Sequence, residues 1–243
     1  MKFSENWLRS FCNPALSSQE LANALTMAGL EVEEILPAAP AFDGVVVGEV
    51  LEVSPHPNAE KLRICSVDVG ETDILSIVCG APNARPGIKV PCAKLGAHLP
   101  GVQIKEAKLR GVSSQGMLCS AAELGSSEDD SGLFVLDPAS KVGQDIRQTL
   151  DLDDKVLSLT LTANRGDCLS LLGVAREVAA ITGGELCFPS VATVNNTLPD
   201  LMNVTLSAAE ACPRYTGLVI RGVNARAQTP DHIVRRLERS GIR

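Results

Sequence analysis

The chain has 243 residues, of which 45% are hydrophobic, and its formal net charge is −7. Such a composition is ordinary for a globular protein of one to three domains, and the charge has the wrong sign for a chain that coats nucleic acid with its whole surface. No apolar run approaches the roughly 20 residues of a membrane span, and the N-terminus lacks the apolar core of a signal peptide, so we expect a cytoplasmic protein.

The first 39 residues predict two short helices and a strand. Ser4 can cap a helix that runs to Phe11, a second helix is expected from Gln19 to Ala28, and a strand is expected over Leu30–Leu36. A segment of about 36 residues cannot bury a core alone. It is therefore predicted to need a partner from elsewhere in the chain.

The middle of the chain is rich in short β-type runs separated by glycines. After Pro37–Pro40, the expected strands are Val45–Val53, Leu62–Val69, Ile74–Cys79, Lys89–Ala93 and Leu133–Leu136, with a short piece at Met117–Leu118. Five or six short strands within about 100 residues are typical of an OB-type barrel. Residues 40–150 are predicted to form it.

The predicted partner for the N-terminal segment follows Asp154. A strand is expected over Val156–Thr162 and a helix over Leu169–Thr182, which Asp167 is expected to cap. The predicted fold is therefore an α+β multidomain chain. Its OB-fold barrel is inserted into a small split α/β domain made of residues 1–39 and 152–190.

Residues 191–243 predict a linker and the truncated start of a third domain. Strands are expected over Asn203–Leu206 and Tyr215–Val223, and a helix is expected between Thr229-Pro230 and Ser240-Gly241. Because these elements would be an unfinished domain, we expect the polypeptide to be an N-terminal part of a longer protein.

Eight cysteines stand singly in the sequence, and no CxxC pair occurs. None of the three histidines neighbours a cysteine, so we expect reduced, mostly buried thiols and no metal site. His56 and His98 have no candidate nucleophile near them in the sequence, and no catalytic residue is predicted.

One part of the barrel segment is locally basic. Between Arg85 and Arg110 the sequence holds six basic residues against the single acid Glu106. Basic side chains on an OB surface contact phosphates, and nearby polar side chains can donate hydrogen bonds to RNA. The predicted RNA-contact residues are Lys61, Arg63, Lys94, Lys108, Arg110, Ser114 and Gln115, and the alternative for each is a solvated or structural role.

Aromatic residues are scarce in the same segment. Phe42 and Phe134 are its only aromatics, so it lacks the stacking platforms that grip unpaired bases. Any RNA contact is therefore expected to read backbone and shape.

Longer motifs carry a family resemblance. The middle segment, with Lys108-Leu109-Arg110-Gly111-Val112 and Gly116-Met117-Leu118-Cys119-Ser120, is similar to a tRNA-binding domain found in free-standing tRNA-binding proteins and in some synthetases. The flanks resemble the beta subunit of bacterial phenylalanyl-tRNA synthetase. They do so in Met27-Ala28-Gly29-Leu30-Glu31-Val32, Asn164-Arg165-Gly166-Asp167-Cys168-Leu169-Ser170, Gly173-Val174-Ala175-Arg176-Glu177 and Ala211-Cys212-Pro213-Arg214-Tyr215.

The resemblance implies a non-catalytic role for this chain within an enzyme. The family is an α2β2 heterotetramer that uses ATP and magnesium to charge tRNA(Phe) with phenylalanine, and aminoacylation belongs to the alpha subunit. The editing pocket lies in a B3/B4-like domain that residues 191–243 would only begin. The chain is thus expected to bind tRNA and to scaffold the alpha subunit, with no catalytic site or cofactor of its own and no activity when alone.

Two other functions remain open. A stand-alone tRNA-binding module, which works as a homodimer in its family, is disfavoured by the split flanks. An OB domain used mainly for domain or subunit interaction is favoured by the acidic total charge and the scarcity of aromatics.

Overall fold

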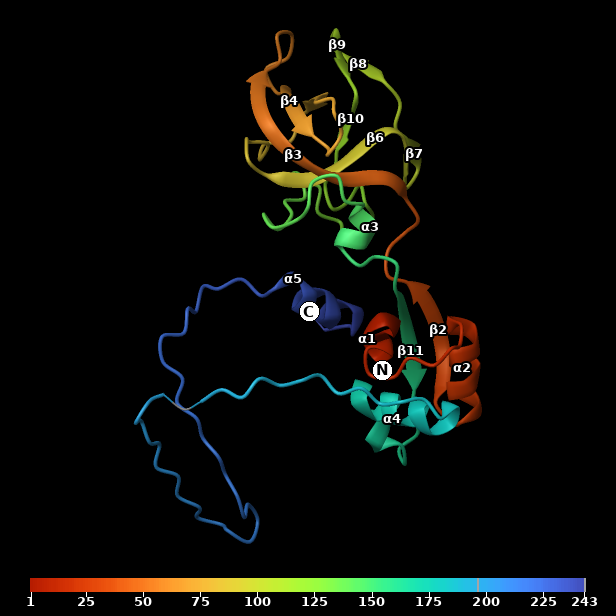
Figure 1. Ribbon diagram of the computed structural model, residues 1–243, viewed down its shortest axis with the longest axis vertical. Helices are drawn as coiled ribbons and strands as arrows, with labels where there is room; N and C mark the ends of the chain where they lie inside the picture. The colour runs from red at the N-terminus through yellow and green to blue at the C-terminus, as the bar shows by residue number, and fades with distance from the viewer. Residues whose placement is uncertain (196, 243) are drawn as a thin grey trace.

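Strands from distant parts of the sequence meet in one small antiparallel sheet. The computed structural model describes residues 1–195 and 197–242. In it, β1 (Lys2–Ser4) and β2 (Glu31–Pro37) flank β11 (Lys155–Thr160) in the order β1-β11-β2. Figure 1 shows this sheet in the lower lobe of the molecule, joined to the upper lobe by the chain before β3 and by the chain after α3.

The helices of the lower lobe begin at capping serines. Ser4 caps α1 (Glu5–Arg9), and Ser17 forms a reciprocal capping box with Glu20 at the start of α2 (Ser18–Met27). Ser170 caps α4 (Leu171–Thr182), where its hydroxyl accepts a hydrogen bond from Gly173 N at 3.0 Å. The prediction that Asp167 caps this helix is therefore wrong. Asp167 lies in the preceding 3₁₀ turn η1 (Gly166–Cys168).

One hydrophobic core unites the two flanking segments of the sequence. The N-terminal segment contributes Phe3, Leu8 and Leu25, and the later segment contributes Leu157 and Val174, all 1% exposed or less. The first 36 residues therefore share a hydrophobic core with residues that follow Asp154.

The upper lobe is a curled, entirely antiparallel sheet that forms a half-barrel. Its strands are β3 (Asp43–Pro55), β4 (Arg63–Asp68), β5 (Leu75–Cys79), β6 (Lys89–Leu99), β7 (Val102–Gln103) and β10 (Gly116–Leu118). The order is β10-β6-β3-β4-β5, and β7 pairs with β6. The short hairpin of β8 (Ala107–Leu109) and β9 (Val112–Ser114) stands beside this sheet, and α3 (Ile146–Thr149) follows it.

The long strand β3 serves two cores because it is irregular. Its register shifts at Val50/Glu52 against β4 and at Asp43/Val45 against β6, and such irregularities bend a strand and increase its twist. Val45 and Val47 enter one core, whereas Val50 enters the other. The sheet can thereby curl around its contents.

Three predicted strands do not form. Leu133–Leu136 is extended, but Phe134 N donates to Cys119 O and Leu136 N donates to Lys89 O, so its bonds go to two different segments and build no ladder. Asn203–Leu206 and Tyr215–Val223 are also not strands. Their apolar side chains, such as Leu218 at 75% exposure, have no sheet to pack on.

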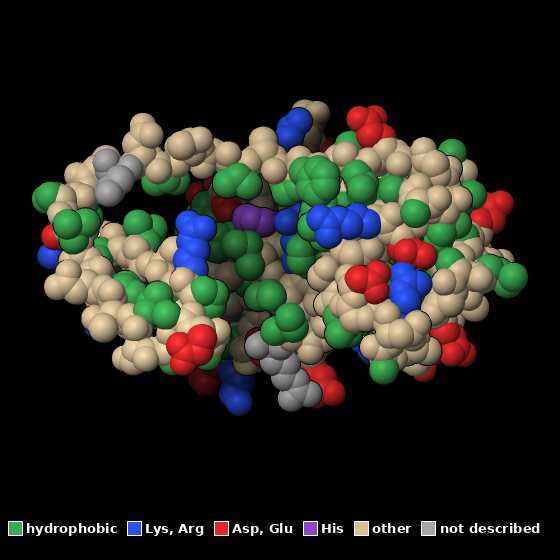
Figure 2. Space-filling view, turned by 90° about the horizontal axis from the view of Figure 1, so that it is seen from below, with side chains coloured by type: hydrophobic (Ala, Val, Ile, Leu, Met, Phe, Trp, Pro, Cys, Tyr) green, Lys and Arg blue, Asp and Glu red, His purple; other side chains and the backbone are tan. Residues whose placement is uncertain are grey.

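The C-terminal helix returns to the lower lobe. Helix α5 (Asp231–Arg239) forms as predicted and lies near β1. Figure 2 shows that on the face seen from below, basic and acidic side chains are interspersed among exposed hydrophobic ones. Among the described residues, no helix combines the length and apolar character that crossing a bilayer requires.

Candidate nucleic-acid interface

The β8–β9 hairpin carries two of the predicted RNA-contact cations. Its turn residues Arg110 and Gly111 have φ angles of 49° and 94°, the pattern of a tight type I′ hairpin turn. Lys108 on β8 and Arg110 at the turn are both exposed. The turn geometry therefore projects these two cations at one end of the half-barrel.

A buried histidine ties this turn to the neighbouring loop. The His56 ring lies 3.0 Å from Leu109 O through Nε2, and its Nδ1 accepts a hydrogen bond from Asn58 N at 3.1 Å. Because Nδ1 is an acceptor, Nε2 carries the hydrogen and donates to Leu109 O. The Asn58 amide donates to Arg110 O at 3.1 Å. The 56–62 loop, which carries Lys61, is thereby fixed against the turn.

Four exposed cations lie on these two segments and on the chain that leads into β8, and we call them the basic cluster. They are Lys61, Lys105, Lys108 and Arg110. Within the part of the chain that the structure describes, none of the four makes an ion pair or a side-chain hydrogen bond. Unpaired and hydrated, they are free to neutralise phosphates. Lys105 was counted in the basic stretch but was not among the predicted contacts.

The two other predicted cations lie elsewhere and are engaged. The ammonium of Lys94 on β6 is 2.9 Å from a carboxylate oxygen of Glu71. The guanidinium of Arg63 on β4 is partly buried and donates to Ala84 O at 2.7 Å. The structure therefore gathers Lys61, Lys108 and Arg110 but does not bring these two into the same group.

Ser114 and Gln115 connect strands of the half-barrel. The Ser114 hydroxyl, in a residue only 4% exposed, accepts from Val78 N at 3.0 Å and donates to Gly116 O at 2.9 Å. The Gln115 side-chain oxygen accepts from Ser76 N at 2.9 Å. These contacts join β5 to the last residue of β9 and to the residue that follows it, so both residues position the hairpin.

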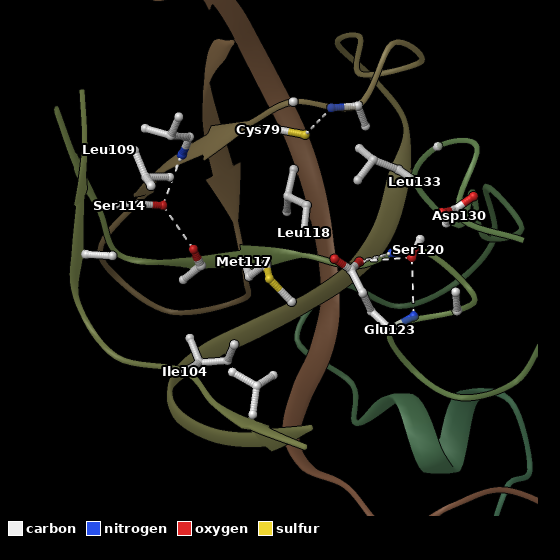
Figure 3. A pocket seen from close by; sticks show the side chains of 18 of the residues that line it. Cys79, Ile104, Leu109, Ser114, Met117, Leu118, Ser120, Glu123, Asp130 and Leu133 are labelled. Atoms are coloured by element: carbon white, nitrogen blue, oxygen red, sulfur yellow. Dashed lines mark hydrogen bonds between the residues drawn. The ribbon is translucent and has the colours of Figure 1, made fainter. Parts of the chain in front are cut away.

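We call the contacts of Ser114 and Gln115 with β5 the seam of the half-barrel. A groove of about 950 Å³ lies between this seam and the loop after β10. Figure 3 shows that Met117, Leu118 and Ile104 line it alongside polar groups. Glu123 accepts from Ser120 N at 2.6 Å and from its hydroxyl at 3.0 Å. Lys105 of the basic cluster also lines the groove, but the other charged lining residues, Glu106, Glu123 and Asp130, are acidic. The basic cluster at the edge of the groove therefore has the chemistry for RNA backbone contact.

A separate polar cluster is built around Arg165. Among the described residues, one group places three potential metal ligands within 4.8 Å of one another, namely Asp167, Cys168 and Glu177. The Arg165 guanidinium donates to all three, with 2.8 Å to Glu177. These bonds raise the pKa of Arg165, chiefly through Asp167 and then Glu177, and Arg165 lowers the pKa of Asp167. The cation at this position is thus the arginine itself.

The middle of the chain matches a known family. Residues 45–145 match the family described as "Putative tRNA binding domain". The chain is also similar to the MetRS-related protein of Pyrococcus horikoshii, with 26% identity and a TM-score of 0.32 over 42% of this chain and 87% of that one.

The sequence matches extend over the whole chain. It is 57% identical to the phenylalanine–tRNA ligase beta subunit of Aromatoleum aromaticum and 59% identical to that of Dechloromonas aromatica, over 100% of this chain in both cases. The chain spans 31% of the length of each of these relatives.

Proposed function

The chain corresponds over its whole length to the N-terminal region of phenylalanine–tRNA ligase beta subunits, and we propose that it is the tRNA-contacting and scaffolding part of such a subunit. The observation that carries this proposal is the basic cluster, which is unpaired, exposed and held in place by His56 and Asn58 within the segment that matches a tRNA-binding family.

The contact is electrostatic. Lys61, Lys105, Lys108 and Arg110 neutralise phosphates of a folded RNA and release its counterions, which gives salt-dependent binding with little base readout. The hydrogen bonds of His56 and Asn58 keep the turn and the loop together before RNA arrives. Less conformational entropy is then lost on binding.

The domain organisation is part of the proposal. Residues 40–150 form an OB-type barrel inserted into a split α/β unit of residues 1–39 and 152–190. Residues 191–243 lead into an editing domain. The shared core of Phe3, Leu25 and Leu157 supports the split unit, and the curled antiparallel sheet supports the barrel.

The whole enzyme supplies what this chain does not. In the proposed α2β2 assembly, the alpha subunit charges tRNA(Phe) with phenylalanine in the cytoplasm, using ATP and magnesium. No residue of this chain takes part in the activation of phenylalanine or in its transfer to tRNA. We therefore expect the chain alone to show neither aminoacylation nor hydrolysis of mischarged tRNA, and either activity would overturn this assignment.

The alternative proposal makes the half-barrel an interaction module. Exposed apolar residues beside the groove, including Val102 at 50% and Leu109 at 41%, favour it. The stand-alone module is disfavoured because the flanks share a core that a free barrel does not need.

A salt titration with labelled tRNA(Phe) tests the proposal. With four phosphate contacts, affinity should fall about 50- to 150-fold between roughly 50 and 200 mM salt. Changing both Lys108 and Arg110 to Ala should weaken binding at low salt and reduce that fall to about tenfold.

The control is Lys155→Ala, which removes one positive charge from β11 of the lower lobe. It should leave both the affinity and its salt dependence close to those of the unaltered chain. Binding that ignores salt or tolerates the double substitution would favour the interaction module.

A further inference from the structure

Two cysteines lie side by side on adjacent strands next to the groove. Cys65 on β4 is opposite Ile77 on β5, and Cys79 lies two residues further along β5. Residues two apart in a strand point to the same face, and both cysteines belong to the same buried core. Cys65 and Cys79 therefore lie diagonally across the two strands on the same buried face.

The surroundings of Cys79 favour its thiolate. The neighbouring Cys65 thiol is the main group that favours it. The Cys79 sulfur also accepts a hydrogen bond from Ala81 N at 3.4 Å, and Arg63 is its cross-strand partner. These groups outweigh burial and the charge of Glu123, so the pKa of Cys79 lies below that of an ordinary thiol. The same contact, together with burial, raises the pKa of Cys65.

The two cysteines differ in access. Cys65 is fully buried, whereas Cys79 is 7% exposed and lines the groove, where Figure 3 shows its sulfur beside the chain that follows β5. A small oxidant can therefore reach Cys79 before it reaches the fully buried Cys65.

We propose that Cys79 is a peroxide-reactive thiol and that Cys65 is its resolving partner. The Cys79 thiolate attacks one oxygen of hydrogen peroxide, the O–O bond breaks, and the departing hydroxide takes a proton to become water. This leaves a sulfenic acid on Cys79. The Cys65 sulfur then attacks the Cys79 sulfur, its thiol proton leaves with the hydroxyl as a second water, and a disulfide joins β4 to β5.

The experiment uses the full chain with Cys187→Ser and Cys212→Ser, because these are the two exposed thiols among the eight. After brief treatment with a small excess of hydrogen peroxide, intact mass should show the loss of two hydrogens. Non-reducing peptide mapping should join the Cys65 and Cys79 peptides. Cys79 should react about tenfold faster than Cys92, whose pKa burial raises to about 12.

Two further variants separate the roles. In Cys65→Ser, the sulfenic acid on Cys79 should persist and be trapped by dimedone. In Cys79→Ser, Cys65 should stay unlabelled, and a Cys92→Ser control should form the disulfide as before. Circular dichroism checks that each variant folds, and the peptide map of the parent chain decides the question if one does not. Oxidation at Cys92 or Cys119 as fast as at Cys79, or a Cys79 that stays reduced, would overturn the proposal.

Discussion

Gln115 and Ser76 exchange two hydrogen bonds across the seam of the half-barrel. The Gln115 side-chain oxygen accepts from Ser76 N at 2.9 Å, and Gln115 N donates to Ser76 O at 2.9 Å. Backbone groups at the edge of β5 are thus satisfied partly by a side chain, because β10 has only three residues and its ladder runs to β6. The neighbouring Ser114 hydroxyl does the same for Val78 N.

Removing the Ser114 hydroxyl should destabilise the chain. In Ser114→Ala the buried amide of Val78 loses its acceptor, and an unsatisfied buried donor costs about 1–3 kcal/mol. Urea unfolding measures the loss. The control is Ser113→Ala, whose hydroxyl bonds the exposed Glu106 and should cost less than about 0.5 kcal/mol. Equal losses of stability in the two variants would mean that the hydrogen bond from Val78 N to Ser114 contributes no more than an exposed one.

Replacing His56 should loosen the hairpin without touching a basic residue. His56→Ala removes the donor to Leu109 O and the acceptor of Asn58 N, together worth about 1–2 kcal/mol. Amide hydrogen exchange over β8 and β9 should accelerate on the order of tenfold. Affinity for tRNA should fall although Lys108 and Arg110 remain.

His98→Ala serves as the comparison for His56. That side chain is 59% exposed and pairs with Asp43, which is itself exposed, so hairpin exchange should stay unchanged. If His98→Ala accelerates the exchange equally, the anchoring role of His56 is lost.

Local signals in the sequence predicted much of this fold. Apolar residues at helical spacing located α2 and α4, and β-type apolar runs located β3 and β11. These signals succeed because each depends on neighbours within one or two turns of chain.

The β8–β9 hairpin was not predicted because many of its residues are polar and each of its strands has only three residues. Only the Arg110-Gly111 pair, with both φ angles positive, signals a turn there. Likewise, a serine in a polar run gives no sign of whether it faces water. Ser114 proves to be buried, and its contact with RNA stays a prediction, as does that of Gln115. Leu133–Leu136 has the composition of a strand. It forms no ladder, because it makes one backbone hydrogen bond to Cys119 and one to Lys89 and these belong to different segments.

Asp154 should be a sensitive position because its buried carboxylate joins three segments. It accepts from the Ser4 hydroxyl at 2.5 Å, from Asn6 N at 2.9 Å and from Arg239 of α5 at 2.8 Å, with its side chain 0% exposed. Asp154→Ala should cost about 3 kcal/mol or more, since partners of a buried charge are left unpaired. Denaturant unfolding measures this loss, and limited proteolysis should show earlier release of α5.

Asp153→Ala provides the contrast with Asp154 within the same short segment. The Asp153 side chain is 69% exposed and pairs with Arg147, so its loss should cost at most about 1 kcal/mol. A large effect here, or a small one at position 154, would contradict the account of Asp154 as a buried junction.

Gly173 should tolerate no side chain, although it lies inside helix α4. Alanine favours a helix interior by about 1 kcal/mol over glycine, so propensity alone predicts that Gly173→Ala stabilises the protein. A Cβ at this position would, however, overlap the carbonyl oxygen of Asp167 and crowd Cys168. The 3₁₀ turn would have to move away from the helix and disturb the Arg165 cluster, so we expect a net loss of about 2–4 kcal/mol in thermal or urea unfolding.

Gly166→Ala is the matched control, because a Cβ there meets nothing within 4 Å, and it should change stability by less than about 0.5 kcal/mol. A Gly173→Ala variant as stable as the parent would show that the turn can move freely, and the close packing of η1 on α4 would then have no role in holding Arg165.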